Sequence, residues 1–318
     1  MVRDAARRPL LRRLPRRGRW LAGCAVLSAL AMACNCLLPN SFGNLGSLFQ
    51  TVLPWTGLVV PVLLVLALAR RSGLALVVVL IPAVVWCCLF AGVLADKGAA
   101  GGDLTVVSHN VNEENGDPGG TARALIASGA DVVALEELSR KASAKDTYAR
   151  ELASVYRYAQ VRGGVGVWSK YPLRAVEPLE IMPWTRALRA TVDTPQGPVA
   201  VYVAHLASVR VLPSGFATAT RNESGAKLAA LVRAEPLPRV VVLGDFNGSV
   251  EDSALKPLAQ QLSSAQAKAG GGFGFTWPAT FPVVRIDQIM VKGIKPVSSW
   301  TLPATGSDHL PVAASLNL

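Results

Sequence analysis

The sequence predicts a layered α/β domain preceded by three transmembrane helices, and three features of the chain support this. Residues 1–102 contain three long runs without a charged side chain, whereas short β-rich runs alternate with helical stretches after residue 103. The hydrophobic content of 51% and the positive mean hydropathy are too high for one soluble domain of 318 residues. The whole chain is nevertheless too polar for a bundle of membrane helices, so a split architecture is expected.

The three apolar runs cover residues 20–38, 51–69 and 74–95. As a helix, each run is long enough to cross the roughly 30 Å of hydrocarbon in a bilayer. A core helix of a soluble protein can be equally apolar, but three consecutive runs of this length favour a membrane anchor over residues 20–95. Residues 40–47 hold two Gly and two Asn and are expected to form a short turn between the first two spans.

The arginines predict the orientation of this anchor. Residues 1–19 hold eight Arg and one Asp, and Arg70 with Arg71 separates the second run from the third. Because cytoplasmic flanks are enriched in Lys and Arg, both clusters are expected on the inner side of the membrane. The tail 1–19 would then be cytoplasmic, and three crossings would place everything after residue 96 outside the membrane.

A cleaved signal sequence is the main alternative for the first run. Ala31, Met32 and Ala33 precede Cys34, which makes a poor lipoprotein-like cleavage site. Cleavage there would change the anchor. It would leave the downstream domain on the same side of the membrane.

The charge that remains after the membrane region is small. Of the net charge of +11, the tail accounts for +7 and the anchor with its flanks for +2, which leaves +2 for residues 103–318. Proteins that bind nucleic acid normally concentrate Lys and Arg on the binding domain. The nearly neutral domain therefore disfavours a nucleic-acid substrate, which stays an alternative.

All five cysteines lie before residue 103. The downstream domain therefore has no internal disulfide, no thiol nucleophile and no thiolate metal site. Residues 96–102 form a Gly/Ala linker, and residues 103–318 are numerous enough for one sizeable hydrophobic core. The chemistry of this domain is expected to use oxygen and nitrogen groups.

The domain alternates short apolar runs with helical patterns, which predicts a layered α/β fold. The expected strands cover residues 104–108, 132–135, 165–168, 199–203, 240–243 and 286–291. The expected helices cover residues 121–128 and 224–233, and each leads into one of those strands across a few residues. Most of the strands are apolar on both faces, so we expect them inside the sheets.

Polar residues follow the ends of these strands, where side chains gather at one rim of such folds. The clusters are His109 to Asn112, Glu136 with Glu137, His205, Gly244 to Asn247, and Ser307 to His309. The chain has only three histidines, and each lies in one of the clusters. A single capping Asp or Asn is ordinary loop chemistry, but five clusters in series predict an active site.

These clusters resemble the motifs of the endonuclease/exonuclease/phosphatase superfamily, the four-layer α/β sandwich shared by deoxyribonuclease I, abasic-site endonucleases, inositol-polyphosphate phosphatases and neutral sphingomyelinases. The resemblance covers essentially all of residues 103–318, and its motifs occur in the order of the family. They are Ser108-His109-Asn110-Val111, Val133-Ala134-Leu135-Glu136-Glu137, His205-Leu206, Gly244-Asp245-Phe246-Asn247, Arg285-Ile286-Asp287-Gln288-Ile289 and Ser307-Asp308-His309-Leu310-Pro311. The resemblance implies a metal-dependent phosphoric ester hydrolase.

The resemblance also implies a role for each matched residue. Mg²⁺ or Mn²⁺ would be held by oxygen ligands, which hard cations prefer; these are Glu137, Asn110 and Asp308. His309 would be the general base, oriented by Asp287. The remaining expected catalytic residues are Asp245, which would position the attacking water, and the two donors to phosphoryl oxygens, Asn247 and His205.

Two positions depart from the family pattern. Glu136 stands where the second motif usually has Gln, and we expect its side chain to face solvent; an effect on metal affinity is the alternative. Asn112 stands where some family nucleases have Asp, which puts a metal role for it in doubt.

The layout of a basic tail, three spans and a compact outer domain is similar to the actinobacterial teicoplanin-resistance membrane proteins of the VanJ type. That similarity implies a role at the lipid-linked steps of cell-wall synthesis, with a polyprenyl pyrophosphate as a candidate substrate and membrane-proximal phosphoesters as partners. The alternatives are a membrane-tethered nuclease, a sphingomyelinase-like phospholipid diesterase and a non-catalytic sensor domain.

Overall fold

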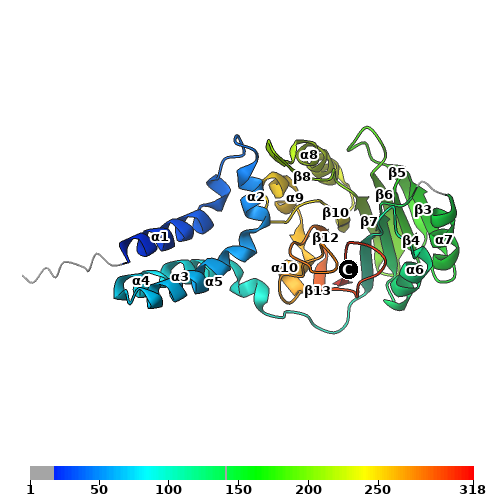
Figure 1. Cartoon of the computed structure of the whole chain (residues 1–318). Helices are drawn as coiled ribbons and strands as arrows, with labels where there is room; N and C mark the ends of the chain where they lie inside the picture. The colour runs from blue at the N-terminus through cyan, green and yellow to red at the C-terminus, as the bar shows by residue number, and fades with distance from the viewer. Residues whose placement is uncertain (1–17, 140–141) are drawn as a thin grey trace, which may run out of the picture. The chain divides into compact units, whose positions relative to one another are not determined.

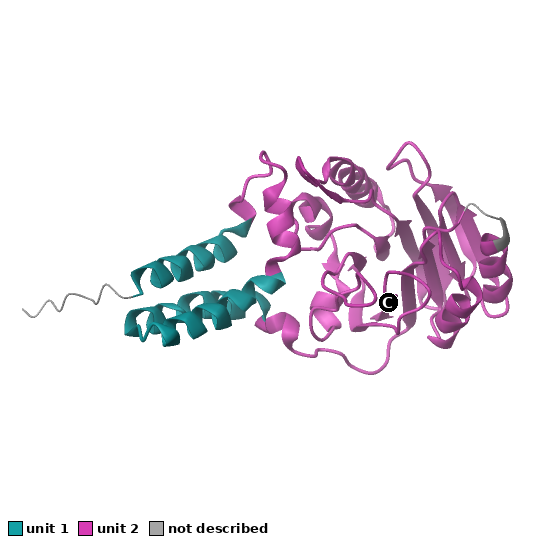
Figure 2. Ribbon diagram, viewed as in Figure 1, with its two compact units in different colours: residues 1–35, 54–90 teal, residues 36–53, 91–318 magenta. Residues whose placement is uncertain are grey.

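The computed structural model describes residues 18–139 and 142–318, and its contacts divide the chain into two compact units (Figure 2). Unit 1 comprises residues 1–35 and 54–90, and unit 2 comprises residues 36–53 and 91–318. Most of the basic tail, residues 1–17, lies outside the described residues.

Unit 1 is built from apolar helices. They are α1 (Arg19–Ala33), most of η2 (Leu53–Leu58), α3 (Val59–Ala69), α4 (Gly73–Val78) and the greater part of α5 (Leu80–Leu94). Over the described residues, only Gly73–Leu94 is by itself long and apolar enough to cross a membrane. The 15 residues of α1 rise about 22 Å, which is less than the hydrocarbon thickness. Leu53–Ala69 is bent by 71° from Leu45–Thr51, so the three-span anchor stays a proposal.

Unit 2 contains two six-stranded sheets (Figure 1). The first has the order β13-β14-β1-β2-β4-β3, and the second has the order β11-β12-β10-β7-β6-β5. The strands of the first sheet are β1 (Leu104–Asn110), β2 (Val132–Glu136), β3 (Tyr158–Arg162), β4 (Val165–Ser169), β13 (Lys295–Thr301) and β14 (Val312–Asn317). Those of the second are β5 (Leu173–Pro178), β6 (Ala187–Thr194), β7 (Gly197–Ala204), β10 (Val240–Asp245), β11 (Ser263–Ser264) and β12 (Asp287–Lys292).

Three hydrophobic clusters show that these elements form four layers. The central cluster joins the facing sides of both sheets, with Val106 from one and Val201 from the other. A second cluster packs the outer face of the β10 sheet against α8 (Ala219–Ala234), η3 (Ser253–Leu255) and α9 (Lys256–Ala259). The third packs the β1 sheet against α6 (Pro118–Ala127) and α7 (Ala142–Leu152). The structure therefore confirms the expected α/β sandwich.

Two parallel crossovers bring the predicted motifs to one rim of the sandwich. β1 pairs in parallel with β2 through α6, and β7 pairs in parallel with β10 through α8. β12 runs antiparallel to β10, so its first residue, Asp287, lies opposite the last residue of β10, Asp245. β14 likewise runs antiparallel to β1, which brings the loop before β14 to the end of β1. Strand ends from both sheets thus surround the same space.

All six expected strands and both expected helices are present in unit 2, but the sequence pattern missed several others. β6 is the most informative, because it is an inner strand that contains Arg189. The guanidinium of Arg189 is buried and forms two hydrogen bonds of 3.0 Å with Glu235, while Tyr202 donates to the same carboxylate. A buried charge is stable only when it is paired in this way, and the pairing is not visible in the hydrophobic pattern.

Residues 36–53 belong to unit 2 although they lie between two apolar runs. Residues 40–47 were expected to form a turn, with the first span before them and the second from residue 51, but the stretch contains part of η1 (Asn35–Leu37) and α2 (Leu45–Thr51). α2 packs against η3 and against the hairpin of β8 (Arg210–Leu212) and β9 (Gly215–Ala217). The Phe216 amide donates a 2.7 Å hydrogen bond to the Gly43 carbonyl, and Asn44 donates to the Phe216 carbonyl at 2.8 Å. The remaining helix, α10 (Ala265–Ala269), contacts β12 and β13.

Gly244, within the Gly-Asp-Phe-Asn motif, is required by the close approach of β10 to β7. Its φ is +144°, and a Cβ there would lie 1.9 Å from the carbonyl oxygen of Ala204. We expect Gly244→Ala to cost at least about 2 kcal/mol and to lower the melting temperature of the full-length protein in detergent by ~5 °C or more. Gly129→Ala is the matched control, because φ is +74° but the space is open, and it should cost about 1 kcal/mol. Equal melting temperatures for the two variants would contradict this account.

Candidate active site

The eight residues expected at the active site all lie at the shared rim. Asn110 ends β1, Glu137 follows β2 and His205 follows β7. The other five come from the end of β10, the start of β12 and the loop before β14; they are Asp245, Asn247, Asp287, Asp308 and His309. The fold therefore brings together residues that are up to about 200 positions apart in the chain.

The carboxylate of Asp245 is the centre of this group. Its Oδ2 accepts hydrogen bonds from the side-chain amides of Asn110, at 3.0 Å, and Asn247, at 3.1 Å. Its Oδ1 accepts from the backbone amide of Asn247 at 2.8 Å. The Nε2 atoms of His205 and His309 lie 3.6 and 4.0 Å from Oδ2. Burial and the charge of Asp287 raise the pKa of Asp245 to about 7, so this carboxylate lacks sufficient positive charge around it.

His309 is oriented by Asp287, as the resemblance implied. The Nδ1 atom of His309 lies 3.0 and 3.1 Å from the two carboxylate oxygens of Asp287, which leaves Nε2 free to face Asp245. Burial alone would lower the pKa of His309, but the charge and hydrogen bond of Asp287, with Asp245 and Asp308, raise it to about 10. The carboxylate fixes the direction of the ring and stabilises its charged form, so that Nε2 carries the exchangeable proton towards Asp245.

A pocket of about 410 Å³ opens beside this centre and is lined by Glu137, His205, Arg186 and Lys145 among others. Glu137 Oε1 lies 3.5 Å from His205 Nε2. One guanidinium nitrogen of Arg186 lies 2.9 Å from His205 Nε2 and 3.0 Å from its Nδ1. Burial, followed by the charge of Arg186, lowers the pKa of His205 well below its usual value, so this imidazole is neutral. The pocket thus combines acidic oxygens with two cations.

Sequence reasoning missed Arg186 and Lys145 as residues of the site. Arg186 directly precedes β6, the inner strand that the hydrophobic pattern did not reveal, and Lys145 lies on α7. Neither belongs to a motif. Because β6 pairs with β7 from Ala187 to Ala204, its start lies beside His205, and knowledge of that register would have placed Arg186 in the pocket.

Asp308 lies at the edge of the group and is exposed. Its two carboxylate oxygens accept hydrogen bonds from Asn112 Nδ2, at 2.9 Å, and from Trp277 Nε1, at 3.2 Å. The backbone amide of Asn112 in turn donates to the side-chain oxygen of Asn110 at 3.0 Å. Asn112 therefore links two residues that were expected to bind the metal.

Glu136 does not face solvent as we expected, because it is fully buried. It is the last residue of β2, and strand geometry turns it away from Glu137 into the space between the sheets. Ser108 Oγ donates a 3.0 Å hydrogen bond to its Oε1, and its Oε2 has no hydrogen-bond partner among the described residues. Burial, and then the charge of Asp287, raises the pKa of Glu136 well above the usual value. A neutral Glu136 resembles the Gln that the motif usually has.

His109 is the one histidine whose side chain does not join the group. It is fully buried, and its Nε2 lies 2.9 Å from Thr305 Oγ1. Burial lowers its pKa to about 3, so the imidazole is neutral. Its position supports a packing role.

The donor groups at the rim fit a divalent cation. One ligand atom from each of Asp245, Asp287 and His309 lies within 4.8 Å of the others. Glu137, which was expected to bind the metal, is partly exposed and faces the pocket. Burial, and then the charge of Asp287, raises the pKa of Asp245, and Mg²⁺ or Mn²⁺ would neutralise the two neighbouring carboxylates. Both donor sets consist of oxygen and nitrogen atoms, as expected for a domain without cysteine.

Residues 107–309 match the model of the endonuclease/exonuclease/phosphatase family, and this range contains every residue of the site. The chain belongs to the endonuclease/exonuclease/phosphatase family. Members of this family hydrolyse phosphoesters and typically use divalent metals, and membership supports phosphoester hydrolysis as the activity of this chain. The protein YbhP of Escherichia coli is 34% identical to it over 111 residues, which are 33% of this chain and 44% of YbhP.

Solved structures share the fold of this family member at low sequence identity. TDP2 of D. rerio, complexed with a single-strand DNA product, has a TM-score of 0.57 and 19% identity, covering 68% of this chain and 99% of that one. Sphingomyelinase C from Streptomyces griseocarneus has a TM-score of 0.52 and 22% identity, covering 67% and 98%. Beta toxin from Staphylococcus aureus, with bound magnesium ions, has a TM-score of 0.52 and 17% identity, covering 67% and 99%.

Glu136→Gln should stabilise the protein increasingly as the pH rises. Because the pKa of Glu136 is raised in the folded state, its contribution to stability is fully present below about pH 4 and is lost as the pH rises towards that raised pKa. With EDTA present, we expect the variant and the native protein to have the same melting temperature at pH 5. At pH 8 the variant should melt a few degrees higher, because each kcal/mol of stability raises the melting temperature by ~2–4 °C.

Differential scanning calorimetry of the full-length protein in detergent measures this difference. Glu177→Gln, at an exposed position of β5, should change neither melting temperature. An equal difference in melting temperature between the native protein and Glu136→Gln at both pH values would mean that Glu136 is charged at pH 5 as well as at pH 8.

Proposed function

We propose that this protein is a membrane-anchored, divalent-metal-dependent phosphoesterase whose catalytic domain lies outside the cytoplasmic membrane. The observation that carries the proposal is the pairing of His309 with Asp287, which aims the free imidazole nitrogen at Asp245 beside a pocket that contains Arg186 and His205. A phosphoester resists attack because its oxygens are anionic, and this site offers a proton-transfer group next to cationic and neutral donors.

The residues of the chain divide this chemistry among them. Arg186 and His205 face the pocket from the start of β6 and the end of β7, where they can donate to phosphoryl oxygens. Asn247 donates to Asp245 and holds its carboxylate in one orientation. His309 exchanges a proton through Nε2, while Asp287 stabilises its charged form. Glu137, with Asn110 and Asp308, would hold the cation, which when bound polarises a phosphoryl oxygen.

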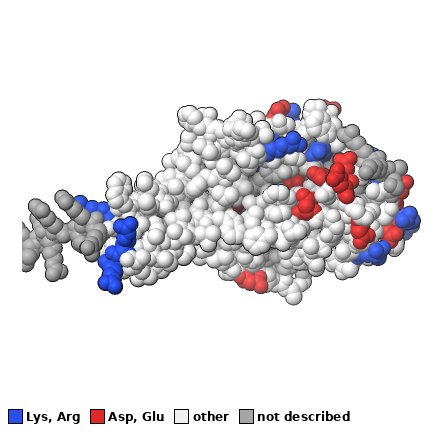
Figure 3. Space-filling view, in the orientation of Figure 1, with Lys and Arg blue, Asp and Glu red and all other residues white. Residues whose placement is uncertain are grey.

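The membrane anchor is supported by the distribution of charge in unit 1. Residues 20–69 and 72–95 contain no Asp, Glu, Lys or Arg. In Figure 3 the described Lys and Arg of this unit gather at one end. Arg70 and Arg71 lie at the turn between α3 and α4, and Gly18, before Arg19, lies against Ser72. Cations confined to one end of an apolar hairpin support a cytoplasmic N-terminus with the catalytic domain outside.

A lipid-linked phosphoester or pyrophosphate is the substrate class that this layout favours. The net charge of +2 over residues 103–318 does not favour nucleic acid. The layout similarity to VanJ-type membrane proteins supports a role in cell-wall synthesis and in glycopeptide, including teicoplanin, resistance. TDP2 and sphingomyelinase C share the fold, which keeps a tethered nuclease and a phospholipid diesterase as rival functions. The complete set of site residues argues against a non-catalytic sensor.

The decisive experiment supplies the full-length protein, in detergent, with a polyprenyl pyrophosphate, sphingomyelin vesicles and plasmid DNA in parallel, with Mg²⁺ or with EDTA. We expect EDTA-sensitive release of inorganic phosphate from the pyrophosphate. His309→Ala should reduce that rate by about 10²–10⁴-fold, because it removes the proton-transfer group, and should shift the melting temperature little. Glu177→Gln is the control for an exposed substitution and should keep full activity.

Other outcomes select among the rivals. Plasmid cleavage without phosphate release would identify a nuclease, and release of a water-soluble headgroup would identify a phospholipid diesterase. Full activity of His309→Ala would refute the mechanism. Binding without turnover of any substrate, in Mg²⁺ as in EDTA, would favour the sensor. Cells that produce the His309→Ala protein should also lose any teicoplanin resistance that the native protein confers.

A further inference from the structure

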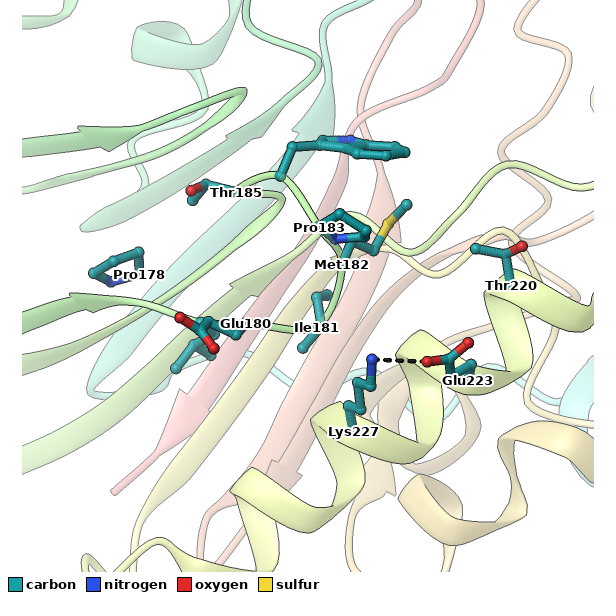
Figure 4. A pocket seen from close by; sticks show the side chains of 11 residues that line it. Pro178, Glu180, Ile181, Met182, Pro183, Thr185, Thr220, Glu223 and Lys227 are labelled. Atoms are coloured by element: carbon teal, nitrogen blue, oxygen red, sulfur yellow. Dashed lines mark ion pairs between the residues drawn. The ribbon is translucent and has the colours of Figure 1, made fainter.

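A second cavity, of about 570 Å³, lies next to the catalytic pocket (Figure 4). Its walls are the segment 178–185, which connects β5 to β6, and one face of α8. Figure 4 shows Met182 and Pro183 of that segment across from Glu223 and Lys227 of the helix. Ile181 is buried in the hydrophobic cluster behind the cavity, whereas Met182 is partly exposed. The volume lies within the range of small-molecule sites, about 300–1,000 Å³.

The cavity and the catalytic pocket share two walls. Trp184 and Thr185 line both spaces, and the next residue, Arg186, contacts His205 in the catalytic pocket. The side chain of Trp184 is 50% exposed, so an apolar ligand can cover it. One short segment therefore presents a guanidinium to a phosphate group on one side and an apolar surface on the other.

The charges of the cavity exclude a second anion. Its one cation, Lys227, forms a 2.8 Å ion pair with Glu223, and Glu180 adds a further negative charge. The strand of a nucleic acid, with a phosphate at every nucleotide, would meet net negative charge here. A hydrocarbon chain attached to a single phosphate or pyrophosphate would instead cover Met182 and Trp184.

We propose that this cavity binds the hydrocarbon chain of a lipid phosphoester while its phosphate occupies the pocket at Arg186 and His205. This inference rests on the proposed phosphoesterase function and narrows the substrate to one with an uncharged, apolar substituent. The cavity then contributes to affinity for the chain, whereas Arg186 and the catalytic centre act on the phosphate.

The test compares farnesyl pyrophosphate with dimethylallyl pyrophosphate, which carry the same pyrophosphate group on a longer and a shorter hydrocarbon chain. Met182→Asp in the full-length protein should raise KM for the farnesyl compound about tenfold or more with kcat unchanged. Its kinetics on the dimethylallyl compound should stay within about twofold of the native values. Met182→Leu keeps an apolar side chain and should behave as native. Val155→Asp, an exposed position outside the cavity, controls for the added charge.

Equal effects of Met182→Asp on both compounds, or none on either, would overturn the assignment of the cavity. Calorimetric binding of both compounds to a His309→Ala background separates this failure from failure of the proposed function, because it needs no turnover. If the farnesyl compound binds more tightly than the dimethylallyl compound, and Met182→Asp abolishes this difference, the assignment of the cavity is supported even if neither compound is hydrolysed. Hydrolysis without any dependence on chain length would leave the function standing and reject the cavity.

A separate observation concerns α2, which lies between two apolar runs in the sequence yet contacts the loop that carries Asn247. Ser47 Oγ donates a 3.0 Å hydrogen bond to Asp252, and Gln50 Oε1 accepts from the Ser253 amide at 2.8 Å. The other carboxylate oxygen of Asp252 is paired with Arg221, whose second nitrogen donates to the Asn247 carbonyl at 3.2 Å. The side chains of Ser47, Arg221 and Asp252 are all buried.

We infer that Ser47 is a positioning residue for Asn247, acting through Asp252 and Arg221. Asn247 has a φ of +47°, a backbone conformation that needs support from its surroundings, and its amide groups hold Asp245. Because Asp252 is buried, loss of one hydrogen-bond donor lets the ion pair shift, and with it the carbonyl of Asn247. The segment 36–53 thereby contributes to the geometry of an active site built from residues after 103.

Ser47→Ala in the full-length protein should lower kcat about tenfold and leave KM within about twofold, because the substrate pocket at Arg186 is unchanged. Ser47→Thr restores the hydroxyl and should recover most of the rate. Thr51→Ala is the matched control. It removes a hydroxyl on the same helix that donates to the Ser47 carbonyl, so kcat should keep its native value. A lower melting temperature with unchanged kcat, or equal losses for Ser47→Ala and Thr51→Ala, would show that the contact is merely structural.

Discussion

The buried carboxylate of Asp245 is the constraint on which the rest of the site depends. It ends an inner strand, lies opposite Asp287 on the next strand, and is surrounded by apolar layers that cannot solvate its charge. The side-chain amides of Asn110 and Asn247 donate hydrogen bonds to this carboxylate, and the imidazole Nε2 atoms of His205 and His309 lie 3.6 and 4.0 Å from it. These donors arrive from both sheets, so the sandwich must close before the carboxylate is satisfied. The negative charges of Asp245 and Asp287, side by side, also make the rim suitable for a divalent cation.

Much of this arrangement could be predicted from the sequence because strand ends have a fixed place in a layered α/β fold. Asn110, Asp245 and His205 each follow an apolar run, and topology alone brings such positions to one rim. Arg186 could not be predicted, because the strand that follows it was not recognised. That strand contains Arg189, which is charged yet buried and therefore interrupts the hydrophobic pattern of an inner strand. Glu136 was misjudged because a carboxylate next to the rim is indistinguishable in sequence from a solvated one; burial depends on strand alternation and on the second sheet.

The small net charge of the catalytic unit conceals a strong local separation of charge. Arg186 and Lys145 face the pocket beside Glu137, whereas the neighbouring cavity has its lysine paired with Glu223. A small excess of cations is therefore compatible with phosphate recognition, provided that they are concentrated at one point. Such an arrangement distinguishes a single terminal phosphate from a polyanion, because affinity for the latter grows with the number of cations along its length. The small total charge of the domain and the concentrated cations of its pocket are thus both consistent with the proposed single-phosphate substrate.

The division of unit 2 into two stretches of chain also sets the order in which its parts can assemble during synthesis. Residues 36–53 leave the ribosome well before residues 91–318, and β14, which pairs with β1, is the last strand to emerge. α2 must therefore wait, without its partner surfaces, until β9 and η3 have been made. His309 follows every other residue of the site along the chain, so a nascent chain that stops before it lacks the imidazole that pairs with Asp287.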